Sequence, residues 1–206
     1  MYITDSATVT SLQPVWRGVL ATSYRALENS VAGVRDDQWD AATPCADWTV
    51  TQVIQHAAGD QLAYAMMLGI GAGPAYDPFS PSGAVEGTAA ELVKEAVEQT
   101  AAAWATVSDD TAAVPTPLPH GELPTPVAAV MCALDAAVHA WDVAIATGQP
   151  SPLDDELAGH LLTAARGVVE PLRQWGAYAP VVEASGEPSA TPVADELLRH
   201  LGRVPR

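Results

Sequence analysis

The stretch TPVAAVMCALDAAVHAWDVAIATG, residues 125–148, predicts the helix around which the fold is organised. Thr125 and Pro126 are typical of an N-cap followed by the first helical position, and Gly148 is typical of the residue just beyond a helix end. Between them, bulky apolar residues recur every three or four positions, which places them on one face of a helix of about six turns. We therefore expect a long helix that packs this face against the core.

Five further segments show helical spacing or helix punctuation. Thr49 with Gln52, and Thr88 with Glu91, have the spacing of a capping box at a helix N-terminus. First-turn prolines mark two later helix starts, and Pro171 is expected to bend or end the helix that contains it. The predicted helices span residues 12–34, 49–68, 89–107, 151 onward and 193–202.

These elements predict an all-α fold, because no segment has the alternating pattern of a convincing strand. Successive long helices favour an up-and-down four-helix bundle with extra C-terminal helices, in one domain spanning residues 1–206. The stretch VPTPLPHGELP, residues 114–124, is expected to be a proline-rich loop. Residues 69–87 are rich in glycine, proline and serine, and they are expected to form a long surface connection or a lid.

The composition is strongly acidic, with 9 lysines and arginines against 25 aspartates and glutamates and a formal charge of −16. A surface of this sign repels phosphate backbones and anionic lipids, so we expect neither nucleic acid nor a membrane as a partner. The sequence has no signal-peptide pattern and no uninterrupted apolar run of about 18 residues, which predicts a cytoplasmic protein. Cys45 and Cys132 form no metal motif and are expected to be reduced thiols.

Three ionisable residues follow one another in the second half of the central helix. Offsets of four and three residues place Asp135, His139 and Asp142 on the same side of it, beside the apolar stripe. A carboxylate and an imidazole four residues apart can chelate a divalent ion, with a third ligand from a facing helix. His56, in the middle of the predicted helix 49–68, is the expected third ligand. Such a set would leave open positions on the ion, as catalytic sites do.

Other interpretations of these residues stay open from the sequence alone. An acid and a histidine four residues apart can also form an exposed ion pair. Asp142 fits better as the hydrogen-bond acceptor of a metal-bound histidine than as a ligand. Cys45 and Cys132 are interpreted as packing residues, although either could be a ligand or a nucleophile. The other histidines, which are expected to be solvated or bonded to carbonyls, are His120, His160 and His200.

Four strings together resemble a known family: TPCADWTVTQVIQHAAGD (43–60), LPHGELPTP (118–126), DAAVHAWDVAIATG (135–148) and LLRHLGRVP (197–205). They resemble the DinB-like metal-binding family, in the branch that includes the N-terminal domain of mycothiol-dependent maleylpyruvate isomerase. The resemblance spans nearly the whole chain. The signals TPC-x2-W before a histidine-bearing helix, and D-x3-HAWD ending in ATG, are specific to this branch when they occur in this order.

The resemblance implies a four-helix bundle that binds a divalent ion through a histidine of the second helix and an acid-x3-His pair of a later one. Those roles fall on His56, Asp135 and His139, the residues that helix geometry also selects. Zinc is the expected ion, and nickel, manganese and ferrous iron suit the same donors. Characterised relatives use the ion to bind the thiolate of mycothiol or bacillithiol, for addition to an electrophile or for isomerisation.

Two departures bear on the expected activity. The isomerase has a glutamate where this chain has Asp135, and a second domain completes its active site, whereas only a short segment follows the fifth predicted helix here. The expected function is therefore a metal-dependent enzyme that uses mycothiol, with a small-molecule thiol and an electrophile as partners, in S-transfer or isomerisation. The alternatives are a non-catalytic metal- or small-ligand-binding protein and a metal-assisted hydrolase. The scarcity of basic residues argues against a densely anionic substrate, and a homodimer is left open.

Overall fold

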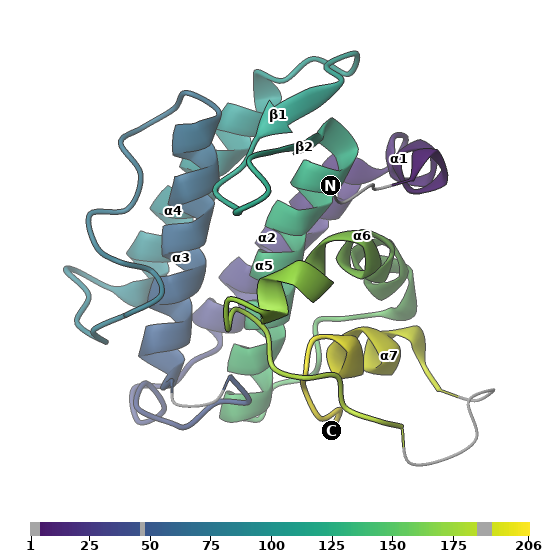
Figure 1. Cartoon of the computed structure of the whole chain (residues 1–206). Helices are drawn as coiled ribbons and strands as arrows, with labels where there is room; N and C mark the ends of the chain where they lie inside the picture. Colours follow the sequence, from purple (N-terminus) through teal and green to yellow (C-terminus); the bar gives the residue numbers. More distant parts are fainter. Residues whose placement is uncertain (1–4, 46–47, 185–190) are drawn as a thin grey trace.

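The computed structural model describes residues 5–45, 48–184 and 191–206, and Figure 1 shows them as packed helices with a small β-hairpin at one end. The expected all-α fold is confirmed. Residues 46 and 47, the two variable positions of TPC-x2-W, lie outside the described part. The described helices are α1 (Ser6–Leu12), α2 (Trp16–Ala32), α3 (Val50–Met67), α4 (Ala89–Ala105), α5 (Thr125–Thr147), α6 (Asp155–Arg173) and α7 (Val193–His200).

The central helix is α5, which packs against α2, α3 and α6 (Figure 1). From Thr125 to Ala144 every residue of α5 is buried except Asp135. Its length and apolarity would also suit a membrane span, but 89% of its most apolar window is buried inside the protein. The apolarity of α5 is therefore explained by its place in the core. Asp135 is the one residue of this part of the helix that is partly exposed to solvent.

The four-helix bundle consists of α2, α3, α4 and α5, but its successive helices do not simply alternate in direction. On α3, Gln61 and Tyr64 meet Thr100 and Trp104 of α4 in the same order, so these two helices run parallel. The helices α2 and α5 run the opposite way (Figure 1). The expected up-and-down order assumed that each connection joins neighbouring helix ends, whereas residues 68–88 run back along α3 before α4 begins.

Most of the predicted helix ends are confirmed to within a few residues. The capping boxes of Thr49 with Gln52 and of Thr88 with Glu91 begin α3 and α4. Gly148 ends α5 at a φ of 74°, a left-handed conformation that favours glycine. The helix predicted from residue 151 begins later, at the N-cap Asp154, and Pro171 lies in its last turn.

The start of α5 differs by one residue from the prediction. Thr125 is the first helical residue rather than the N-cap, which is Pro124. The hydroxyl of Thr125 instead donates a 2.6 Å hydrogen bond to the carbonyl of Thr111. This contact ties the N-terminal end of the central helix to the segment that precedes the hairpin.

The helix predicted over residues 12–34 is confirmed as α2, which begins four residues later than predicted, at Trp16. A separate helix that was not predicted, α1, precedes it from the N-cap Asp5, and Pro14 lies between the two. Proline lacks the backbone N–H that a helix interior needs and its ring clashes with the preceding turn, so the chain breaks there. The seven residues of α1 are mostly serine, threonine and valine, which have low helix propensity, and the sequence pattern therefore did not reveal them.

The absence of strands was a wrong prediction. Within residues 114–124, expected as a loop, β1 (Ala113–Pro115) pairs antiparallel with β2 (Glu122–Pro124). Prolines are tolerated because each strand has a free edge on which no N–H is required. Only one residue per strand, Val114 and Leu123, is buried, so the alternation is too short to recognise in the sequence.

The connection of residues 68–88 is tied to α3 rather than free. Gln55 accepts a hydrogen bond from the backbone of Gly83 and donates to the carbonyl of Ala84. The hydroxyl of Tyr76 donates to the carbonyl of Gln55 at 2.7 Å, and Gln52 donates to the carbonyl of Pro81. These contacts place the middle of the connection against the N-terminal half of α3, which carries His56.

The bundle core yields a first prediction, for the edge-on contact between Trp16 of α2 and Trp104 of α4, whose ring centroids are 5.7 Å apart. Trp16→Ala would leave a cavity, so we expect the free energy of unfolding to fall by about 3–5 kcal/mol. Trp175→Ala is the matched control, because Trp175 is 74% exposed and its loss should change stability by no more than about 0.5 kcal/mol. Urea unfolding measures both, and equal losses would contradict the assignment of Trp16 to the core.

Candidate metal centre

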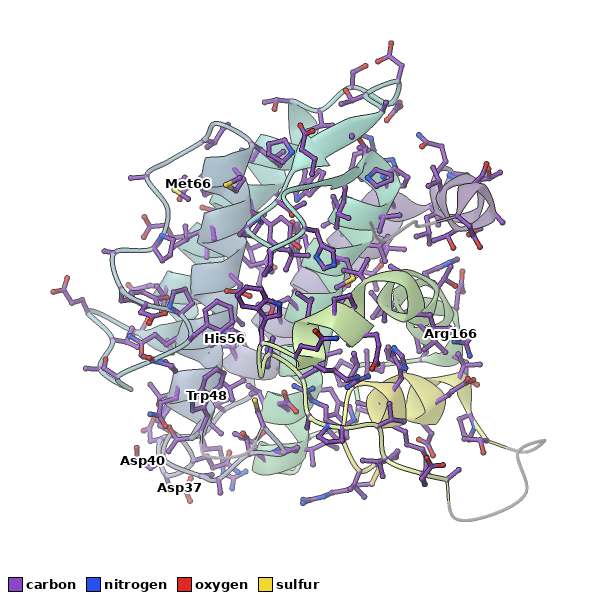
Figure 2. All side chains as sticks on the ribbon, in the orientation of Figure 1. Asp37, Asp40, Trp48, His56, Met66 and Arg166 are labelled. Carbon is purple, nitrogen blue, oxygen red and sulfur yellow. The ribbon has the colours of Figure 1, made fainter. Side chains whose placement is uncertain are left out.

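Three predicted site residues meet where α3 faces α5. The Oδ1 atom of Asp135 lies 3.6 Å from Nε2 of His56 and 3.4 Å from Nε2 of His139. One ligand atom from each of these residues lies within 4.8 Å of the others. His56 reaches this point from α3, as Figure 2 shows, while Asp135 and His139 are one turn apart on α5. The sequence therefore identified three side chains that the fold brings together.

Each imidazole is engaged on its outer nitrogen. Nδ1 of His56 lies 2.9 Å from the carbonyl oxygen of Pro78, and Nδ1 of His139 lies 3.0 Å from Oδ2 of Asp142. A carbonyl or carboxylate oxygen only accepts, so each Nδ1 carries the proton, and a neutral imidazole then has its lone pair on Nε2. Both Nε2 atoms lie within 3.6 Å of Oδ1 of Asp135, so three potential ligand atoms are close enough to share one divalent cation.

The carboxylate of Asp135 is oriented by a buried amide. Nε2 of Gln61 donates to Oδ2 of Asp135 at 3.3 Å and to the carbonyl of Cys132 at 3.2 Å, while Oε1 accepts from the thiol of Cys132 at 3.1 Å. With Oδ2 engaged, Oδ1 is the oxygen presented to the two imidazoles. Gln61 thus fixes which oxygen of Asp135 faces the centre.

The electrostatics of the centre fit a bound cation. Burial, and then the nearby carboxylate of Asp60, raise the pKa of Asp135 well above its ordinary value. Burial lowers the pKa of His139 to about 4, which leaves this imidazole neutral and able to ligate near pH 7. A buried carboxylate beside a second acid is costly to ionise, and Arg203, whose charge lowers the pKa of Asp135, is already paired with Asp142. The residues present therefore fit a divalent ion.

Asp142 lies behind His139 in a buried ion pair. Nε and Nη2 of Arg203 donate to Oδ1 and Oδ2 of Asp142 at 2.9 and 2.7 Å, and the carboxylate is fully buried. Burial alone would raise the pKa of Asp142, but the Arg203 guanidinium and the hydrogen bond from His139 keep it below its ordinary value. Asp142 therefore stays ionised as the acceptor of His139, and the C-terminal turn is bound to the centre through Arg203.

A glycine on α3 allows the carbonyl that positions His56 to approach. A Cβ atom at Gly59 would lie 2.8 Å from Cγ and 2.9 Å from Cβ of Pro78, closer than side chains pack. Gly59 is three residues from His56 on the same helix, so Pro78 rests on the bare backbone beside it. This close approach explains a glycine in the interior of α3, where it otherwise weakens the helix.

A second group of ligand atoms overlaps the first. Cys45, His139 and Asp142 also place one ligand atom each within 4.8 Å of one another. Both oxygens of Asp142 are already engaged by Arg203 and His139, and burial raises the pKa of the Cys45 thiol to about 11. A thiol is a ligand as its thiolate, so this group suits a cation less well than the group of His56, Asp135 and His139.

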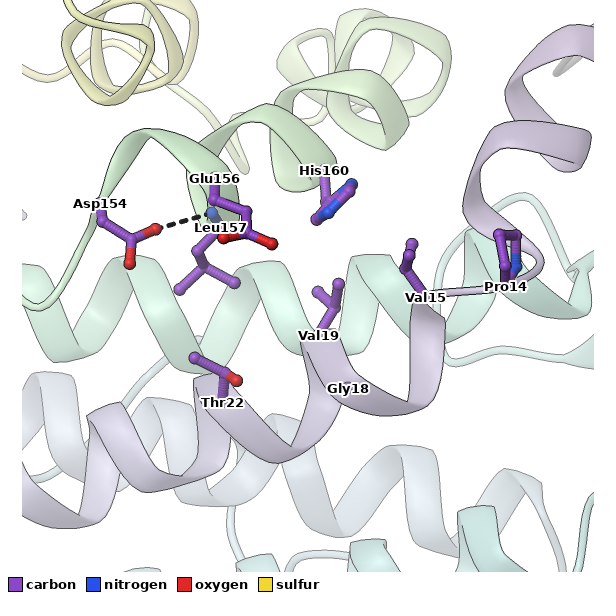
Figure 3. A pocket seen from close by; sticks show the side chains of 9 residues that line it. All are labelled: Pro14, Val15, Gly18, Val19, Thr22, Asp154, Glu156, Leu157 and His160. Atoms are coloured by element: carbon purple, nitrogen blue, oxygen red, sulfur yellow. Dashed lines mark hydrogen bonds between the residues drawn. The ribbon is translucent and has the colours of Figure 1, made fainter.

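The remaining histidines and Cys132 lie elsewhere. His120, His160 and His200 join no cluster of potential metal ligands within residues 5–45, 48–184 and 191–206. His160 lines a cleft of about 420 Å³ between the start of α2 and the first turns of α6, which shares no residue with the candidate centre (Figure 3). Cys132 is buried behind Gln61 and contacts it, in agreement with a packing role.

Sequence reasoning missed three groups that position the ligands: the amide of Gln61, the carbonyl of Pro78 and the guanidinium of Arg203. The carbonyl belongs to a loop, and no sequence signal marks such a group. Gln61 follows His56 by five residues, a spacing that does not by itself place it toward Asp135. Arg203 lies in LLRHLGRVP, one of the strings that resemble the family, but 61 residues separate it from Asp142 and no spacing pattern connects the two.

Comparison with known proteins identifies the family of the chain. A family model described as the mycothiol maleylpyruvate isomerase N-terminal domain matches residues 20–144. Two proteins of Mycobacterium tuberculosis, both described as uncharacterized, are 36% identical over 178 residues, which cover 85% of this chain and 91% of theirs. The crystal structure of a histidine-to-alanine mutant of mycothiol-dependent maleylpyruvate isomerase matches with a TM-score of 0.57 at 15% identity, over 87% of this chain and 78% of that one. At that identity the structural match shows a shared fold.

The packing at Gly59 yields a second prediction. Gly59→Ala should displace Pro78, remove the acceptor of His56 and weaken metal affinity by the 10–100-fold typical of losing such a partner. Gly159→Ala on α6 is the control, since its Cβ would make only an ordinary contact at 3.9 Å. Isothermal titration with zinc compares the two variants, and wild-type affinity in Gly59→Ala would show that Pro78 does not position His56.

The buried ion pair yields a third prediction. Arg203→Met leaves the Asp142 carboxylate buried without its partner, so the free energy of unfolding should fall by about 3–5 kcal/mol. Combining Arg203→Met with Asp142→Asn removes both charges and should restore most of that loss.

Arg166→Met is the matched control, because the pair of Arg166 with Glu196 is exposed and should contribute no more than about 1 kcal/mol. Chemical denaturation measures all of these variants. A double variant as unstable as the sum of the two single ones would contradict the ion-pair account.

Proposed function

Because the chain belongs to the mycothiol maleylpyruvate isomerase N-terminal domain family, we propose that it is a divalent-metal-dependent enzyme that uses a low-molecular-weight thiol. The ligands are His56, Asp135 and His139, the preferred ion is zinc, and the thiol is mycothiol. The reaction is S-transfer to an electrophile or an isomerisation that passes through the thiol. The observation that carries the proposal is the position of both Nε2 atoms, 3.6 and 3.4 Å from Oδ1 of Asp135.

The donor set supports a catalytic role over a closed structural one. Two imidazoles and one carboxylate occupy three positions, whereas a structural zinc site uses four protein ligands. A bound divalent cation would lower the pKa of a thiol held against it, so that the thiol is deprotonated at neutral pH. The chain itself contributes two imidazoles, one oriented carboxylate and a second carboxylate, Asp60, whose Oδ2 lies 3.9 Å from Nε2 of His56. Asp60 is placed to accept a proton from a group that enters beside His56.

Mycothiol suits a site with few basic side chains. A low-molecular-weight thiol can bind through its sulfur to the ion, and this contact does not require a cationic surface. The chain has a single lysine, Lys94, which pairs with Glu98 on the surface of α4. Near the centre, Arg203 forms an ion pair with Asp142, so its charge is already compensated. The charge distribution therefore favours a neutral thiol compound over an anionic one.

The fold should remain stable without the ion, so loss of the metal can be measured separately from unfolding. The three ligands come from α3 and α5, and these helices pack through a continuous apolar core of which the ligands are not part. Variants that lose the ion should therefore keep their helical circular dichroism, unlike domains that a structural metal folds.

The fourth prediction tests the proposed function with Co²⁺, which reports its ligands spectroscopically. The wild type should bind one Co²⁺, and added mycothiol should produce a thiolate-to-cobalt charge-transfer band. His56→Ala and Asp135→Asn should lose both signals while remaining helical, because the first removes a ligand and the second removes the negative charge of the carboxylate ligand. Asp135→Glu should retain Co²⁺, because it keeps a carboxylate at that position.

His160→Ala is the control for histidine removal, since His160 lies in the separate cleft. Binding of Co²⁺ without any spectral response to mycothiol would contradict thiol use and favour a metal-binding protein or a metal-assisted hydrolase. Loss of helical structure in His56→Ala would instead make the metal structural.

A further inference from the structure

Two aromatic rings flank His56 at the mouth of the candidate centre. The ring centroid of Trp48 lies 4.7 Å from that of His56, with an interplanar angle of 45°, and the ring of Phe79 lies 5.4 Å away at 63°. Trp48 is half-buried, whereas Phe79 is 62% exposed. Phe79 is the only phenylalanine of the chain. A ligand that approaches His56 therefore meets aromatic surface before it meets a charge.

Trp48 is fixed by the turn that precedes α3. The hydroxyl of Thr43 lies 2.9 Å from the carbonyl oxygen of Trp48 and 3.0 Å from that of Cys45. The backbone N–H of Trp48 donates to the carbonyl of Cys45 at 3.2 Å, and Thr49 then begins the helix. The position of this ring is thus set by the same turn that starts α3.

Phe79 is fixed although it is exposed. Its backbone N–H donates to Oδ1 of Asp77 at 2.9 Å, and the preceding residue, Pro78, accepts from Nδ1 of His56. Pro78 in turn rests on Gly59. The contact that orients His56 for ligation therefore also places the backbone of Phe79 beside it, and the exposed ring of Phe79, in edge contact with His56, is available to a ligand.

The charges around these rings disfavour an anionic ligand. The carboxylates of Asp60, Asp135 and Asp142 lie around the two histidines, and the guanidinium of Arg203 is engaged by Asp142 and by the carbonyl of Leu201. With the open position of the proposed metal ion taken by the thiol, a carboxylate or phosphate on the ligand would face these acids. A planar, uncharged group would instead gain from contact with the faces and edges of the two rings.

We infer that Trp48 and Phe79 form an aromatic subsite that takes an uncharged, planar, apolar group of the electrophile. The inference rests on the proposed function, which requires an electrophile as substrate. It adds the chemical class of that electrophile. Phe79 is the specificity-determining residue, because it is exposed and free to contact the ligand. Trp48 forms the inner wall, next to the imidazole of His56.

The test uses two small probes of equal ring size and different charge, acetophenone and benzenesulfonate. Each is titrated into the full chain as purified, with no thiol added, and the imidazole resonances of His56 are followed by NMR. Acetophenone should shift these resonances, and benzenesulfonate should bind more weakly. In Phe79→Ala the Kd for acetophenone should rise about two- to tenfold, the effect of losing one aromatic contact.

Two further variants separate a ring contact from a general effect. Phe79→Tyr keeps the ring and should keep the wild-type Kd for acetophenone. Met66→Ala removes an exposed apolar side chain of α3, the helix that carries His56, at a point ten residues and about 15 Å along the helix from His56. This variant should keep the wild-type Kd for acetophenone. Because Phe79 is exposed, Phe79→Ala should also retain its helical circular dichroism and thermal unfolding.

An unchanged Kd in Phe79→Ala, or tighter binding of benzenesulfonate than of acetophenone, would overturn the inference. Failure of the subsite and failure of the proposed function give different results. Without the subsite, acetophenone leaves the His56 resonances unmoved while the cobalt–thiolate band still forms. Without thiol chemistry, that band is missing while acetophenone still binds in a Phe79-dependent manner.

Discussion

The centre depends on one constraint, namely that each of two imidazoles is engaged on its outer nitrogen so that its inner nitrogen is free. His56 is engaged by a loop carbonyl and His139 by the buried carboxylate of Asp142. Only with Nδ1 protonated on both rings do two lone pairs face the oxygen of Asp135. If either outer contact were lost, the ring could rotate or change tautomer, and three adjacent ligands would no longer form a binding site.

This constraint explains features of the fold that would otherwise be unrelated. The connection between α3 and α4 is long because it returns along α3 to deliver the Pro78 carbonyl, and α3 carries a glycine where that residue rests. The C-terminal turn is attached to the bundle through Arg203 because Asp142 needs a buried counter-charge. Both segments lie outside the four-helix core, yet each determines the orientation of one ligand.

The sequence predicted more of the centre than of the parts that support it. Two capping boxes and the Thr-Pro and Gly punctuation of α5 located the main helices, and helical spacing then placed His56, Asp135 and His139. The division at Pro14, the short hairpin and the return of residues 68–88 were not predicted, because they depend on contacts between segments distant in sequence. Gln61 and Arg203 were missed for the same reason, since their partners are 74 and 61 residues away.

The central claim, that one divalent ion binds to His56, Asp135 and His139, is tested most directly by X-ray absorption spectroscopy of the zinc-loaded chain. The account predicts one zinc per chain, with two imidazole nitrogens and carboxylate oxygen at about 2.0–2.2 Å and no sulfur ligand before a thiol is added. Zinc–sulfur scattering at about 2.3 Å would contradict it. That result would place the ion instead on the overlapping group of Cys45, His139 and Asp142.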